Sequence, residues 1–148
     1  MSEKKEEVKA VKEVKKTITL SYSVDAILVR TPLRFLSDAI AARRFLEGVV
    51  VSVIYFERFG IDRLKEYFNS KNVPLDALKV ESLRLQIIMR MLEGFSIIDH
   101  HIHSLMGEVC QYRNTIVHEL RHPDAIDENK VKATIEKAIE CLKALGAT

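Results

Sequence analysis

Apolar residues recur at helical spacing from Leu33 onward, directly after Pro32. A broad apolar face of this kind predicts one long helix that should lie at the centre of the fold. We expect Gly60 to end or kink this helix, Ile61–Phe68 to add another turn or two, and 69–74 to form a loop. The apolar positions of the predicted long helix are Phe35, Leu36, Ala39, Ile40, Phe45, Leu46, Val49, Val50, Val53, Ile54 and Phe56.

Three further helices follow from the same pattern. One is predicted from about Leu75 or Asp76 to Leu92, with Gly94 as its stop signal. Ser96 and Asp99 resemble a capping box that opens the next helix, and Asp127 is a natural cap for the last one. The next helix has Ile98, Ile102, Leu105, Val109, Tyr112 and Ile116 on one face, and the last has Val131, Ile135, Ala138, Leu142 and Leu145. The predicted fold is therefore all-α, an antiparallel bundle of four to five helices spanning residues 33–148.

Residues 1–32 form a different kind of segment. Residues 2–16 alternate Lys and Glu and predict a short exposed helix or a tail, and 17–22 and 26–29 could form extended stretches. No apolar stretch there resembles a secretory signal, and Gly48–Phe56 is shorter than the roughly 20 residues that span a bilayer. We expect a cytoplasmic protein with no membrane partner.

Composition narrows the function only a little. The chain has 148 residues, enough for one packed domain, and 23 Lys and Arg against 21 Asp and Glu give a net charge of only +2. Contact with RNA would therefore need a local patch, for which Arg84, Arg90, Arg113 and Arg121 are candidates. Cys110 and Cys141 occupy apolar helical positions, which predicts reduced core residues.

Chemically capable side chains gather in 112–122, which reads Tyr-Arg-Asn-Thr-Ile-Val-His-Glu-Leu-Arg-His. Cleaving RNA without a metal requires a base near the 2′-hydroxyl and a fixed positive charge beside the phosphate. His118 can exchange a proton near neutral pH, Arg113 can bind phosphate through two parallel hydrogen bonds, and Asn114 can orient either one. An unbroken helix would put Arg113 and His118 on different faces, so we expect either fraying near Leu120 ahead of Pro123 or a second chain to unite them.

Tyr-Arg-Asn-x-x-x-His, before the last helix of a helical domain, resembles the motif of the HEPN family (higher eukaryotes and prokaryotes nucleotide-binding). The resemblance implies that Arg113 and His118 are the active pair, with Asn114 as the polar residue beside the arginine. It implies a homodimeric, metal-independent endoribonuclease without cofactors, whose product ends in a 2′,3′-cyclic phosphate. We assign Tyr112, Arg121 and Glu47 to substrate binding, with Glu47 either hydrogen-bonded toward Arg113 or at the bundle surface.

The family includes toxins and defence proteins, so the resemblance also suggests an antitoxin or nucleotidyltransferase partner. The chain has Leu120 where one toxin subgroup has Tyr two residues after the His, which argues against that subgroup's chemistry and its nucleotidyltransferase. Other members are non-catalytic modules that bind nucleotide, RNA or protein, and such a module is the alternative function.

Two histidine clusters raise the question of a metal. His118, Glu119 and His122 spell His-Glu-x-x-His, a zinc-hydrolase arrangement, but Arg121 and Pro123 disturb it. Its third ligand would have to be Glu136 or Glu140. His100, His101 and His103, with Asp99, form the second cluster, which we interpret as a solvated polar face. We therefore assign no metal ligand, and a zinc metallohydrolase that uses His-Glu-x-x-His remains a remote alternative function.

Overall fold

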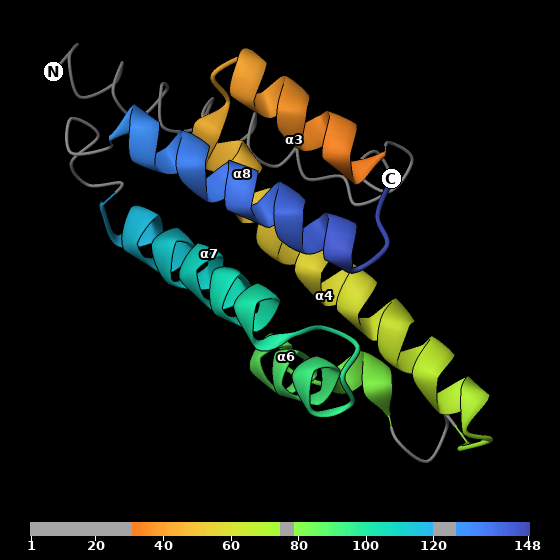
Figure 1. Cartoon of the computed structure of the whole chain (residues 1–148). Helices are drawn as coiled ribbons and strands as arrows, with labels where there is room; N and C mark the ends of the chain where they lie inside the picture. The colour runs from red at the N-terminus through yellow and green to blue at the C-terminus, as the bar shows by residue number, and fades with distance from the viewer. Residues whose placement is uncertain (1–30, 75–78, 120–126) are drawn as a thin grey trace, which may run out of the picture. The chain divides into compact units, whose positions relative to one another are not determined.

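The computed structural model describes residues 31–74, 79–119 and 127–148, which contain helices and no strand (Figure 1). The expectations for residues 1–30 lie outside this part of the chain. The helices are α3 (Pro32–Ala41), α4 (Phe45–Ser70), the 3-10 helix η1 (Val80–Ser82), α6 (Leu85–Gly94), α7 (His100–Glu119) and α8 (Glu128–Ala144). The prediction of an all-α helical bundle is confirmed at this level.

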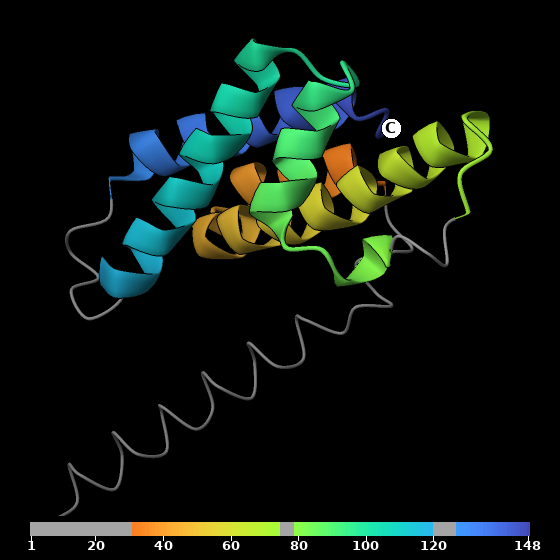
Figure 2. The same ribbon diagram turned by 90° about the horizontal axis from the view of Figure 1, so that it is seen from below.

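Helix α4 is the central element, because it packs against every other helix of the described residues. Helix α8 lies along α4, and α3 and α7 each contact both of them. Helix α3 is antiparallel to α4, and α7 is antiparallel to α8 (Figures 1 and 2). As a result, α3 and α7 end, and α4 and α8 begin, at the same end of the bundle. No helix among the described residues is both long enough and apolar enough to cross a membrane.

The predicted long helix from Leu33 is wrong, because the chain turns between α3 and α4. Arg43 adopts a left-handed backbone conformation with φ of 56°, and Arg44 N donates to Ala39 O at 2.8 Å. This is a helix-ending geometry that usually carries glycine. An arginine at this position gives no stop signal in the sequence. The apolar pattern therefore predicted one helix where the structure has two.

Gly60 does not end the helix, which is one of the two alternatives predicted for it, since α4 continues through it to Ser70. Gly60 is buried, and a Cβ atom added to it would lie 2.6 Å from Ile88 Cγ2 of α6. Gly48 meets α8 in the same way, with a built Cβ 2.6 Å from Ile135 Cδ1. These glycines let helices approach closely and do not break α4.

Helix α6 begins at Leu85 and is shorter than the helix predicted from about Leu75 or Asp76. Ahead of it, Lys79 has φ of 45°, η1 follows, and Arg84 is extended with ψ of 148°. Val80 is buried from within η1, so one apolar position of the predicted helix is satisfied by a 3-10 turn instead. Helix α6 ends at Gly94, the predicted stop signal, two residues after the predicted last residue Leu92.

Helix α7 is capped by Asp99, whereas the predicted capping box had Ser96 as the N-cap and Asp99 three residues after it. Asp99 Oδ1 accepts from Ile102 N at 2.8 Å, while Ser96 stands in the turn before it with φ of 58°. The predicted apolar face of α7 is confirmed. Five of its members are buried, namely Ile98, Ile102, Leu105, Val109 and Ile116.

Helix α8 matches its prediction. Asp127 Oδ1 accepts from the backbone N of Asn129 at 3.0 Å and of Lys130 at 3.4 Å, which satisfies two donors of the first turn. The five predicted core positions of α8 are all buried. Cys141 is buried and Cys110 half-buried, both as free thiols, and burial raises the pKa of Cys141 to about 12. The expectation of a core residue is confirmed for Cys141, whereas Cys110 is only half-buried.

Candidate functional site

Arg113, Asn114 and His118 all lie in the last two turns of α7. Asn114 Oδ1 accepts hydrogen bonds from Arg113 Nε at 3.2 Å and from Nη2 at 3.1 Å. The amide thus holds the guanidinium, while Asn114 and His118 are exposed and Arg113 is half-buried. Among the described residues, no carboxylate forms an ion pair with Arg113.

One chain does not bring Arg113 and His118 onto the same face. Helix α7 continues past His118 to Glu119, so fraying does not free the imidazole. Five helical residues correspond to about 140° around the axis and about 7.5 Å along it. Leu120 and Pro123 themselves lie outside the described residues.

The assigned substrate-binding residues are only partly gathered. The half-buried Tyr112 ring has Lys130 Nζ of α8 at 5.9 Å from its centroid. Glu47 Oε1 accepts instead from Arg44 Nη1 at 3.0 Å, so its described partner is Arg44 and not Arg113. Arg121 is not among the described residues.

Charged residues of both signs lie at the end of the bundle where α3 and α7 end and α4 and α8 begin. Arg43 pairs with Glu128 of α8, and Arg44 pairs with Glu47 of α4. Arg113 at the end of α7 and Lys130 in the first turn of α8 add positive charge there. Fixed cations at one end can attract phosphate even in a chain of near-neutral total charge.

The His-Glu-x-x-His motif is divided by the limits of the described residues. His118 is exposed on α7, whereas His122 lies outside the described residues. Glu140, one suggested third ligand, hydrogen-bonds at 3.2 Å to His101 Nε2, in the first turn of α7. Seventeen helical residues separate His101 from His118, a rise of about 25 Å, so Glu140 is too far away to complete that site.

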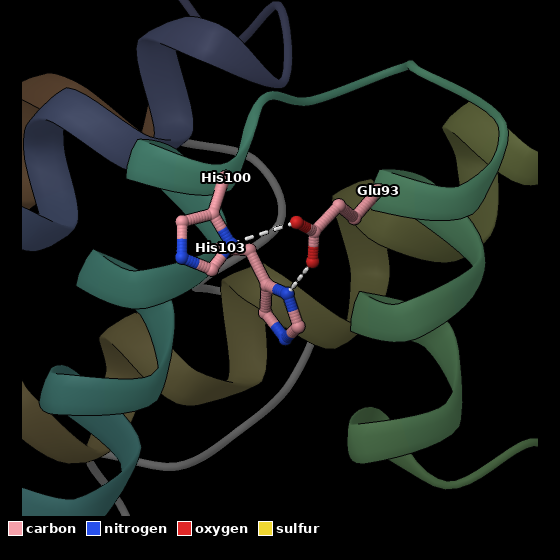
Figure 3. Close-up of side chains that lie close together, drawn as sticks. All are labelled: Glu93, His100 and His103. Carbon is pink, nitrogen blue, oxygen red and sulfur yellow. Dashed lines mark hydrogen bonds and ion pairs between the residues drawn. The ribbon is translucent and has the colours of Figure 1, made fainter.

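The structure assembles a second cluster that the sequence analysis treated as a solvated polar face. Glu93, near the end of α6, points between His100 and His103 on the first turn of α7 (Figure 3). Glu93 Oε1 lies 2.8 Å from His100 Nδ1, and Glu93 Oε2 forms a hydrogen bond with His103 Nδ1. These bonds, the one with His103 first, lower the pKa of Glu93 below its ordinary value.

Glu93 was missed because it lies seven residues before His100, across a turn. The sequence did contain one signal, because Glu93 directly precedes Gly94, the predicted stop of its helix. If the chain reverses after that stop, the last turn of this helix lies beside the first turn of the next one. His100 and His103, three residues apart, then face that turn together.

Neither a scan against models of known protein families nor searches of curated proteins and of solved structures found a match for this chain.

Proposed function

We propose that the chain is a metal-independent endoribonuclease of the HEPN type that acts as a homodimer. The observation that carries the proposal is the Arg113–Asn114 pair: a guanidinium fixed by a neighbouring amide, free of described carboxylates, in the same exposed helix end as His118. The resemblance of the Tyr-Arg-Asn-x-x-x-His motif to that family supplies the reaction.

In this mechanism His118 removes the proton of the ribose 2′-hydroxyl, and the 2′-oxygen attacks the adjacent phosphorus. The bond to the 5′-oxygen breaks, and the leaving oxygen takes up a proton. The products are a 2′,3′-cyclic phosphate and a 5′-hydroxyl end. Arg113 stabilises the additional negative charge on the phosphate, and Asn114 keeps its fork in one orientation.

Homodimerisation enters the proposal because α7 separates the two side chains. A second copy with a twofold axis near the ends of the α7 helices would set His118 of one copy beside Arg113 of the other. Lys130 beside Tyr112 adds a cation for the flanking phosphates.

A mixed RNA pool incubated with the full chain in excess EDTA tests the proposal. We expect wild type to cleave and to leave cyclic phosphate ends, while Arg113→Ala and His118→Ala lose about 100-fold or more. Arg34→Ala and His101→Ala serve as matched controls that change the same residue types elsewhere. Cleavage that survives both site variants, or that requires metal, contradicts the proposal.

The second candidate is a non-catalytic module that binds nucleotide, RNA or a partner protein. The separation of Arg113 from His118 on one continuous helix favours it if the chain is monomeric. Retained RNA binding by wild type, weakened by Arg113→Ala but without any cleavage, would support this function.

A further inference from the structure

Within the part of the chain that the structure describes, Glu93, His100 and His103 form a group that could hold a metal ion. One potential ligand atom from each lies within 4.8 Å of the other two. They come from two helices and form one group at the reversal between α6 and α7 (Figure 3). His103 has a side chain that is only 27% exposed, and Glu93 is 32% exposed, so the group is partly sheltered by the protein.

The backbone that carries these side chains is fixed by interactions other than their own hydrogen bonds. In the reversal, Phe95 N donates to Met91 O at 2.9 Å and Ile97 N to Leu92 O at 2.8 Å. The Asp99 cap then holds the first turn of α7. The three residues are therefore positioned even when a metal replaces the bonds between them.

Aromatic packing adds a second constraint on the same turn. The Phe95 ring stacks on Tyr67 of α4 with centroids 4.6 Å apart and an angle of 14° between the planes. It also meets Phe68 edge-on at 5.5 Å. The residue two positions after Glu93 is thus anchored to the central helix, which limits movement of α6 relative to α7.

The donor set indicates which metal would bind. Two imidazole nitrogens and one carboxylate oxygen are ligands typical of zinc and other late first-row divalent ions, whereas Mg²⁺ and Ca²⁺ prefer oxygen. Tetrahedral zinc with bonds of about 2.0–2.1 Å places its ligand atoms about 3.4 Å apart. Small rotations of side chains that already lie within 4.8 Å reach that spacing.

Charge favours the same ion. A carboxylate beside two imidazoles offers a divalent ion one negatively charged oxygen donor and two neutral nitrogen donors. An ion bridging Glu93 to the histidines would replace two hydrogen bonds with metal bonds and tie α6 to α7.

We propose that Glu93, His100 and His103 bind one zinc ion through three protein ligands, with a remaining position for water. The side chain of His100 is 85% exposed, which leaves the group accessible from solvent. This site is separate from the proposed ribonuclease site, since ten helical residues, or about 15 Å of rise, lie between His103 and Arg113.

Calorimetric titration of metal-free full-length protein, produced without a histidine tag, with ZnCl₂ tests the inference. We expect one zinc per chain, and a dissociation constant at least about tenfold weaker in His100→Ala, His103→Ala and Glu93→Gln. Co²⁺ bound in place of zinc should give the visible absorption of a four-coordinate complex in wild type and not in these three variants. Because the His100 side chain is largely exposed, His100→Ala tests the ligand with little risk to folding.

His101→Ala is the matched control, because His101 is on the same turn of α7 but pairs with Glu140. It should bind zinc as wild type does. No saturable binding, or equal binding by wild type and the three cluster variants, would overturn the proposal. Loss of zinc in His118→Ala with retention in His103→Ala would also overturn it, because the metal would then sit at the His-Glu-x-x-His motif.

Discussion

Glycine has a hydrogen atom where alanine has a methyl group, and at Gly60 this difference decides how closely α4 can approach α6. A Cβ atom at Gly60 would lie 2.6 Å from Ile88 Cγ2, and this methyl is attached next to the backbone, so it cannot swing away. Gly107, in the interior of α7, has no atom within 4 Å of the corresponding position. The same substitution should therefore have opposite effects at the two positions.

We expect Gly60→Ala to lower the free energy of unfolding by about 1–2 kcal/mol, because overpacking outweighs the gain in helix propensity. Gly107→Ala should raise it by about 0.5–1 kcal/mol, since only the propensity changes. Urea denaturation followed by circular dichroism measures both. Stabilisation by Gly60→Ala would show that α4 and α6 are not in close contact.

The Glu93 carboxylate gives a residue-scale prediction about pH. Its pKa is lowered by the hydrogen bonds of His103 and then of His100. A group with a depressed folded pKa stabilises the fold above its unfolded pKa, and this contribution is lost as the pH falls through the folded value. The melting temperature in EDTA should thus fall more steeply below about pH 5 for wild type than for Glu93→Gln. Parallel curves for the two proteins would contradict this assignment.

At the scale of elements, the start of α8 depends on one side chain. Asp127 Oδ1 accepts from two backbone N–H groups that would otherwise lack a helical partner. Asp127→Ala should cost about 1 kcal/mol in urea denaturation, whereas Asp127→Asn, which keeps the acceptor, should cost clearly less. Equal losses in the two variants would assign the effect to charge instead of the hydrogen bond.

Some of the helices could be predicted from the sequence, and others could not. Helices α7 and α8 were predictable because each has one regular apolar face and an Asp cap, and both signals are local. The break at Arg43 was not, because a left-handed arginine has no compositional signal. Gly60 gave the wrong signal, since its role depends on Ile88, which is distant in the sequence. The start of α6 was misplaced because η1 buries Val80 without an α-helix.

The candidate site was predictable to a different extent. The sequence identified Arg113, Asn114 and His118 from their chemistry, and the structure adds that Asn114 holds Arg113. Helix α7 stays helical through Glu119, and Leu120, near which fraying was expected, lies outside the described residues. Glu93 beside His100 and His103 required knowledge of how α6 reverses into α7, which periodicity does not contain.

At the scale of the whole molecule, the proposed reaction requires two copies of the chain. Arg113 and His118 point to different sides of α7, so a dimer would supply the pair across its twofold axis. Zinc at the opposite end of α7 would leave this arrangement untouched. The two proposals can therefore fail independently of each other.

Complementation between two inactive variants tests the central claim most directly. Arg113→Ala and His118→Ala chains are unfolded together, refolded as a mixture and assayed for RNA cleavage in EDTA, with each variant refolded alone as the control. Random pairing makes about half of the dimers mixed, each with one intact Arg113 and one intact His118, so about a quarter of wild-type activity should return. A mixture that stays as inactive as either variant alone would contradict a shared site.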